Sequence, residues 1–150
     1  MASYAARGLR LRYEQAGGGR PVVLLHGMSN HCLAWAPQLD ALAAAGWRPV
    51  LPDLAGHGWS DPVTERTTTE DLAGDVVALL DVLEVAAGVR VPVLAVAGRH
   101  DRLAPPQMVE QIAVSVPCGR LEVVEDAQHL VNLERPDRFN ELLLGLLAQA

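Results

Sequence analysis

The chain of 150 residues has little of what marks several specialised protein classes. Its two cysteines, Cys32 and Cys118, are too few for a disulfide framework, which fits a reducing compartment. No apolar run approaches the roughly 18 residues that a membrane span needs. The N-terminus lacks the basic and apolar regions of a signal peptide. We therefore expect a cytoplasmic protein without a membrane partner.

Positive charge is also scarce. Lysine is absent, and all 12 basic residues are arginine, which is typical of a GC-rich bacterial genome. The net charge of −6, with no basic run, predicts no nucleic-acid partner. Hydrophobic residues make up 50% and charged residues 20%, as in ordinary globular proteins. A chain of this length predicts one domain over residues 1–150.

Short apolar runs alternate with helical patterns along the chain. Strands are expected near residues 8–15, 21–25, 48–53, 91–98 and 121–124, and helices near 34–45, 67–87, 105–116 and 135–149. Thr67 and Glu70 fit a capping box at the start of the second helix. This alternation predicts an α/β fold of three layers, with a mostly parallel sheet and helices on both faces. The site should lie in the loops at the carboxyl ends of the strands.

Four motifs in those loops follow one another in a recognisable order. They are VVLLHG at 22–27, DLAGHGWSD at 53–61, GRHDRLAP at 98–105 and QHLVNLERP at 128–136. In this order the sequence resembles the α/β-hydrolase family. The resemblance implies Asp101 as the acid and His129 as the base of a catalytic triad. It also implies an oxyanion hole that uses the backbone at Met28 and Gly27.

The resemblance fails where the family carries its nucleophile. Relatives place G-x-S-x-G on a strand-to-helix elbow after the 67–87 helix, whereas this chain passes almost directly into the 91–98 strand. None of its four serines, and neither cysteine, has glycine two residues before and two after. We expect a shortened α/β-hydrolase fold, with the missing segment near residues 86–90 and no cap. The nucleophile is unknown, with Ser29 and Cys32 as candidate substitutes.

Two functions remain open from the sequence. The first is a weak hydrolase of small esters, lactones or similar carbonyl substrates, because a base without its nucleophile supplies only about 10²–10⁴ in rate. The second is a catalytically inactive pseudoenzyme that binds a ligand or a protein, which includes a homodimer. Neither requires a cofactor. A metal site formed by His26, Asp53, His57 and His129 has no supporting ligand spacing, so no metal is expected.

Overall fold

The computed structural model describes residues 1–84, 93–114 and 119–149. The chain forms two compact units, Met1–Val89 and Arg90–Ala150. The single domain expected over residues 1–150 stays a prediction, and the expected missing segment near 86–90 lies outside the described residues. Among the helices within those ranges, none combines the length and the apolar character needed to cross a bilayer.

Unit 1 is built on a four-stranded mixed sheet. Its strands are β1 (Ala2–Ala6), β2 (Leu9–Gln15), β3 (Arg20–Val23) and β4 (Trp47–Asp53), in the order β1-β2-β4-β3. The β1–β2 and β2–β4 pairs are antiparallel, and only β3–β4 is parallel. The sheet of this unit is therefore mixed, rather than mostly parallel as predicted. Strand β1 was not predicted at all.

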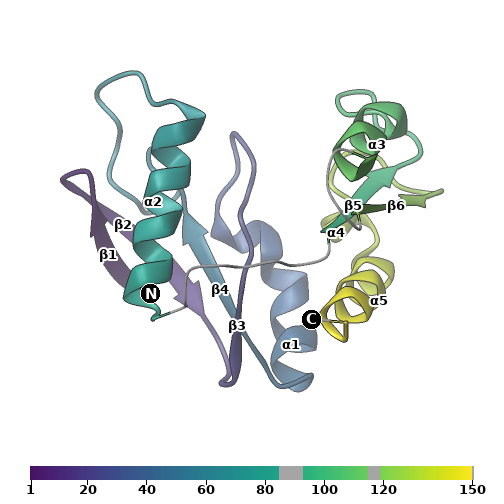
Figure 1. The fold of residues 1–150 in the computed structure, drawn as a ribbon, viewed down its shortest axis with the longest axis horizontal. Helices are drawn as coiled ribbons and strands as arrows, with labels where there is room; N and C mark the ends of the chain where they lie inside the picture. Colours follow the sequence, from purple (N-terminus) through teal and green to yellow (C-terminus); the bar gives the residue numbers. More distant parts are fainter. Residues whose placement is uncertain (85–92, 115–118, 150) are drawn as a thin grey trace. The chain divides into compact units, whose positions relative to one another are not determined.

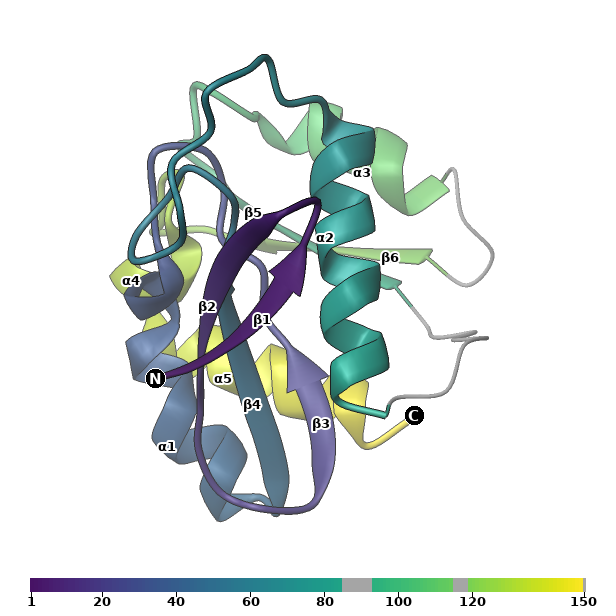
Figure 2. The same cartoon turned by 90° about the vertical axis from the view of Figure 1, so that its left-hand side faces the viewer.

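Helices cover both faces of this sheet. A short 3₁₀ helix, η1 (Cys32–Trp35), leads into α1 (Ala36–Ala44), and α2 (Thr69–Val82) follows β4. Figure 2 shows α1 and α2 on opposite sides of the sheet. Val50 and Leu51 are neighbours in β4 and therefore face opposite sides, yet both are fully buried. The expected three-layer arrangement is thus present in unit 1.

The N-cap of helix α2 lies one residue later than predicted. Thr68, not Thr67, accepts the N–H of Asp71 at 3.2 Å, and the Asp71 carboxylate accepts the N–H of Thr68 at 2.8 Å. The predicted pairing of Thr67 with Glu70 is wrong, because an aspartate can close the box as well as a glutamate. Three consecutive threonines made the register ambiguous in the sequence.

Unit 2 has a two-stranded parallel sheet of β5 (Val93–Gly98) and β6 (Gly119–Val124). Its helices are α3 (Pro106–Val114), α4 (Val131–Glu134) and α5 (Pro136–Leu147), with α3 and α5 on the two sides of the sheet (Figure 1). Val124, Ala127, Val131 and Leu142 form the buried core of this unit. The parallel pairing of β5 with β6 confirms the predicted parallel arrangement for the two strands that precede Asp101 and His129.

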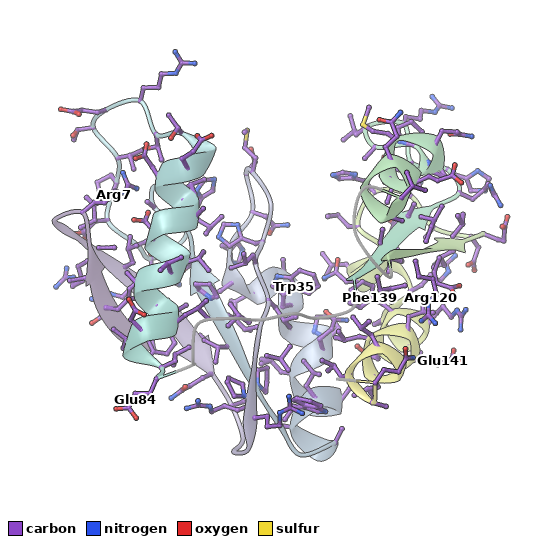
Figure 3. All side chains as sticks on the ribbon, in the orientation of Figure 1. Arg7, Trp35, Glu84, Arg120, Phe139 and Glu141 are labelled. Carbon is purple, nitrogen blue, oxygen red and sulfur yellow. The ribbon has the colours of Figure 1, made fainter. Side chains whose placement is uncertain are left out.

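A bidentate ion pair fastens the β1–β2 hairpin to α2. Arg7 lies at the turn of the hairpin beside α2 (Figure 3). Its Nε and Nη2 donate to the two carboxylate oxygens of Asp75 at 2.8 and 2.6 Å. Asp75 is fully buried, whereas the Arg7 side chain is 35% exposed. The arginine therefore neutralises a carboxylate that water cannot reach.

Replacing Arg7 by methionine should destabilise unit 1. We expect Arg7→Met to lower the free energy of unfolding by about 2–3 kcal/mol, because it leaves the Asp75 carboxylate buried and unpaired. Urea denaturation followed by circular dichroism measures this loss. The matched control is Arg66→Met, which alters an exposed arginine and should cost less than about 0.5 kcal/mol. Equal losses in the two variants would contradict the role given to this ion pair.

Candidate active site

Asp101 is held in the tight turn that follows β5. Its backbone N–H donates to the carbonyl of Gly98 at 3.2 Å. Its Oδ1 accepts the N–H groups of Leu103 at 2.8 Å and Ala104 at 3.0 Å. These two bonds from the following residues are typical of an aspartate that organises its own turn. These hydrogen bonds from its own turn hold the Asp101 carboxylate in position independently of other side chains.

His129 lies in the loop that follows β6, and its ring meets Asp101. The Nδ1 atom of His129 is 2.9 Å from Oδ2 of Asp101. Because Asp101 is buried and His129 is 51% exposed, the pair runs from the interior to the surface. The two residues that the sequence motifs single out as acid and base are therefore in contact.

The charge state of Asp101 follows from its surroundings. Burial alone would raise the pKa of this carboxyl group. Hydrogen bonds from the Ala104 backbone, from His129 and from the Leu103 backbone outweigh burial and hold the pKa below its usual value. Asp101 is therefore ionised at neutral pH. It accepts the proton on Nδ1 of His129, which leaves Nε2 as the basic nitrogen of the neutral ring.

Gly98 permits the two loops to approach each other. A β-carbon at this position would overlap the carbonyl oxygens of Ala127 and Gln128. The same contact is reinforced by a hydrogen bond of 3.0 Å from the His100 N–H to the Ala127 carbonyl. The motif glycine before Asp101 thus has a steric reason, because only glycine lets the His129 loop pass this close to the end of β5.

The predicted oxyanion residues, Gly27 and Met28, belong to unit 1, in the loop after β3. The Gly27 carbonyl is held from two sides, by Nδ1 of His26 at 2.8 Å and by the N–H of Asn30 at 3.3 Å. In a planar trans peptide the N–H points opposite to the C=O. The N–H of Met28 therefore points away from the His26 ring, and its direction is fixed. Met28 is itself 90% exposed.

His26 has a structural task in the described structure. The N–H of Leu54 donates to Nε2 of His26 at 3.0 Å, so Nδ1 must carry the ring proton that goes to Gly27. This arrangement requires the neutral ring and ties the loop after β3 to the end of β4. Burial lowers the pKa of His26, and the neighbouring His57 acts in the same direction.

Three metal-ligating side chains gather in unit 1, at His31, Cys32 and Asp53. Their ligand atoms lie within 4.8 Å of one another. The Asp53 carboxylate already accepts the backbone N–H groups of Cys32 at 2.6 Å and Trp59 at 2.9 Å. Burial and the nearby Asp53 raise the pKa of the Cys32 thiol to about 11, so it is protonated at neutral pH. These features favour a hydrogen-bonded support for the loops over a metal centre.

The serines and cysteines have different surroundings. Ser60 donates to the Asp53 carbonyl at 2.6 Å and accepts the Arg12 N–H at 2.9 Å, so its hydroxyl is engaged in the fold. Cys32 is a free but buried thiol, which suits it poorly to act as a nucleophile. Ser29 lies in the loop after β3 with a φ of +60°. Cys118 and Ser115 lie outside the described residues, and so do residues 86–90, near which the elbow segment is expected to be missing.

Comparison with known proteins agrees with the α/β fold of the chain. Residues 20–88 match the family model described as alpha/beta hydrolase fold. The chain is 38% identical over 60 residues to carboxylesterase YbfK of Bacillus subtilis. It is 33% identical over 70 residues to 3-oxoadipate enol-lactonase 1 of Acinetobacter baylyi. These alignments take in 39% and 47% of this chain but only 20% and 26% of the two relatives.

Solved structures agree on the fold. The enol-lactonase from Burkholderia xenovorans LB400 superimposes with a TM-score of 0.90 at 19% identity, covering 98% of this chain and 100% of that one. The chain has the alpha/beta hydrolase fold, as the four motifs predicted, in a sequence of 150 residues. Sequence reasoning had not identified the residue that holds the His129 loop in place, Glu134. Its position in a helix of only four residues gave little signal.

The neutral His26 makes the stability of unit 1 depend on pH. Its pKa is lowered in the folded protein, so the unfolded chain, with a pKa near about 6.5, takes up the proton first on acidification. The unfolded state then binds more protons, and stability falls as the pH drops below that value. We expect a slope of at most about 1.4 kcal/mol per pH unit in this window.

Urea denaturation at pH 7.5, 6.5 and 5.5 measures this slope. The variant His26→Gln should be less stable at pH 7.5 but should lose most of the slope, since it carries no titrating ring. The control His31→Gln removes an exposed histidine from the same loop and should keep the slope. If His26→Gln and the unsubstituted protein have the same slope, the structural role assigned to the neutral ring is wrong.

Proposed function

We propose that the chain hydrolyses small esters or lactones, with His129 as the general base and Asp101 as the group that orients it. The observation that carries this proposal is the hydrogen bond of 2.9 Å between His129 Nδ1 and Asp101 Oδ2, which leaves the half-exposed ring with Nε2 as its base. The names of two relatives, a carboxylesterase and an enol-lactonase, support the same reaction class.

Water is the nucleophile in this proposal, because the sequence has no G-x-S-x-G elbow. The water oxygen attacks the carbonyl carbon of the substrate while one water proton passes to Nε2 of His129. The ionised Asp101 stabilises the resulting imidazolium. When the tetrahedral intermediate collapses, the bond to the leaving alkoxide breaks and Nε2 returns the proton to it. The products are a carboxylic acid and an alcohol, joined in one molecule for a lactone.

The negative oxygen of the intermediate needs donors, and the resemblance to the α/β-hydrolase family is the ground on which we propose the N–H of Met28 for this role. Support comes from the Gly27–Met28 peptide, whose carbonyl is fixed by His26 and Asn30. A donor with a fixed direction stabilises the developing charge without reorganising. In relatives with an elbow, the residue after the nucleophile supplies a second donor. Since loss of one donor costs about 10²–10³ in rate, we expect weak activity.

The alternative function is a ligand-binding or protein-interaction module without catalysis, of which a homodimer is one form. The observation that favours this alternative is that the sequence lacks the G-x-S-x-G elbow. The two functions differ in one measurable respect. A binding module should gain nothing from the basicity of His129, whereas the hydrolase depends on it entirely.

Hydrolysis of a short-chain p-nitrophenyl ester by the 150-residue protein tests the proposal. We expect His129→Ala to reduce the rate over buffer by about 10²-fold or more, and Asp101→Asn to reduce it as well, because the ring loses its orienting acceptor. The control His31→Gln removes an exposed imidazole elsewhere and should leave the rate unchanged. Equal rates in His129→Ala and the unsubstituted protein would reject the hydrolase and favour the binding module.

A further inference from the structure

Glu134, which lies within the 128–136 motif, contacts the backbone of the loop that carries His129. Its two carboxylate oxygens accept two backbone N–H groups, Oε2 that of Gln128 at 2.8 Å and Oε1 that of Leu130 at 2.9 Å. These are the residues immediately before and after His129. One side chain therefore holds the backbone on both sides of the residue that carries the ring.

The two hydrogen bonds that Glu134 accepts add to other restraints on the loop that carries His129. On its other side the loop is fixed to the turn of Asp101 through the hydrogen bond from the His100 N–H to the Ala127 carbonyl at 3.0 Å. The short α4 carries Glu134 in its last turn, and the Glu134 N–H donates back to the Leu130 carbonyl at 2.9 Å. Glu134 and Leu130 are thus joined by two hydrogen bonds in opposite directions.

We infer that Glu134 is a positioning residue for His129, which sets the direction of the imidazole ring toward Asp101. This inference rests on the proposed function, since it names the group that holds the proposed base, His129, in position toward Asp101. Charged hydrogen bonds to a carboxylate are roughly twice as strong as neutral ones. Two of them, placed on either side of one residue, restrict the backbone torsions from which the ring projects. A general base needs this restriction, because a displacement of about 1 Å can cost 10²-fold in rate.

The neighbouring ion pairs have a different role. Arg135 donates through Nε to Asp126 at 2.6 Å, and Arg99 binds Glu125 through two hydrogen bonds. These pairs join exposed side chains and touch no backbone group next to His129. Surface pairs of this kind contribute little to stability. Only Glu134, among the described residues of this loop, binds the backbone directly on both sides of the ring.

The test uses two replacements of different severity. Glu134→Ala removes both acceptors. Glu134→Gln keeps the length of the side chain and one carbonyl oxygen, so it can hold one N–H but not both. The matched control is Glu141→Gln, the same replacement on α5, where Glu141 binds the exposed Arg138 at 2.7 Å (Figure 3).

The first readout is the tautomer of His129, measured by nitrogen-15 NMR of histidine-labelled protein and assigned with a His129→Gln sample. We expect the Nδ1–H form in the unsubstituted protein and in the control. Glu134→Ala should give a mixture of both tautomers, and Glu134→Gln an intermediate result. The second readout is ester hydrolysis. Here kcat should fall between about 10-fold and 10²-fold in Glu134→Ala, less in Glu134→Gln, with KM unchanged.

The outcomes separate this inference from the proposed function. A changed tautomer with no activity in any sample would reject the hydrolase while keeping Glu134 as the residue that positions the ring. An unchanged tautomer and an unchanged kcat in Glu134→Gln that unfolds cooperatively would overturn the inference, even if Glu134→Ala failed to fold. Absence of the Nδ1–H form in the unsubstituted protein would overturn it as well.

Discussion

The parallel pairing of β5 with β6 is the constraint on which the candidate site depends. In this register Gly98 lies opposite Val124, so both strands end at the same level. The two loops then leave the sheet side by side, at the separation of neighbouring strands. Because Gly98 has no side chain, the second loop can pass against the end of the first. The contact between His129 and Asp101 is therefore a consequence of strand register and of one missing β-carbon.

Three acidic residues are buried in the part of the chain that the structure describes. A buried carboxylate must be compensated by hydrogen bonds or by an opposite charge. Asp53 is compensated by backbone N–H groups, Asp75 by the guanidinium of Arg7, and Asp101 by backbone N–H groups together with His129. Only the last arrangement ends in a base whose side chain is half exposed. The difference between a structural acid and a candidate catalytic one thus lies in its partner.

The sequence predicted correctly those helices and strands whose residue pattern fits one type of secondary structure best. The short apolar runs before Asp101 and His129 were predicted as strands, and their order placed both residues at one edge of a sheet. Strand β1 was missed because small residues surround Tyr4, so its alternation is weak, although Tyr4 is buried. Helix α2 was placed correctly but its cap was not, because Thr67 and Thr68 are chemically equivalent. Glu134 lies within the 128–136 motif, but its hydrogen bonds to the N–H groups of Gln128 and Leu130 depend on the path of the loop, which the motif alone does not give.

The absence of a nucleophile elbow changes which features of the fold must be precise. In an elbow the attacking oxygen belongs to a side chain of the protein, so its position relative to the base is set by the fold. Water has no such tether, and its attack depends on how firmly the base and the oxyanion donor are held. In this chain the Gly27 carbonyl of unit 1 is bound from two sides, and in unit 2 the backbone of the His129 loop is bound by Glu134. Each set of hydrogen bonds restricts, within its own unit, the loop that carries one of the proposed groups.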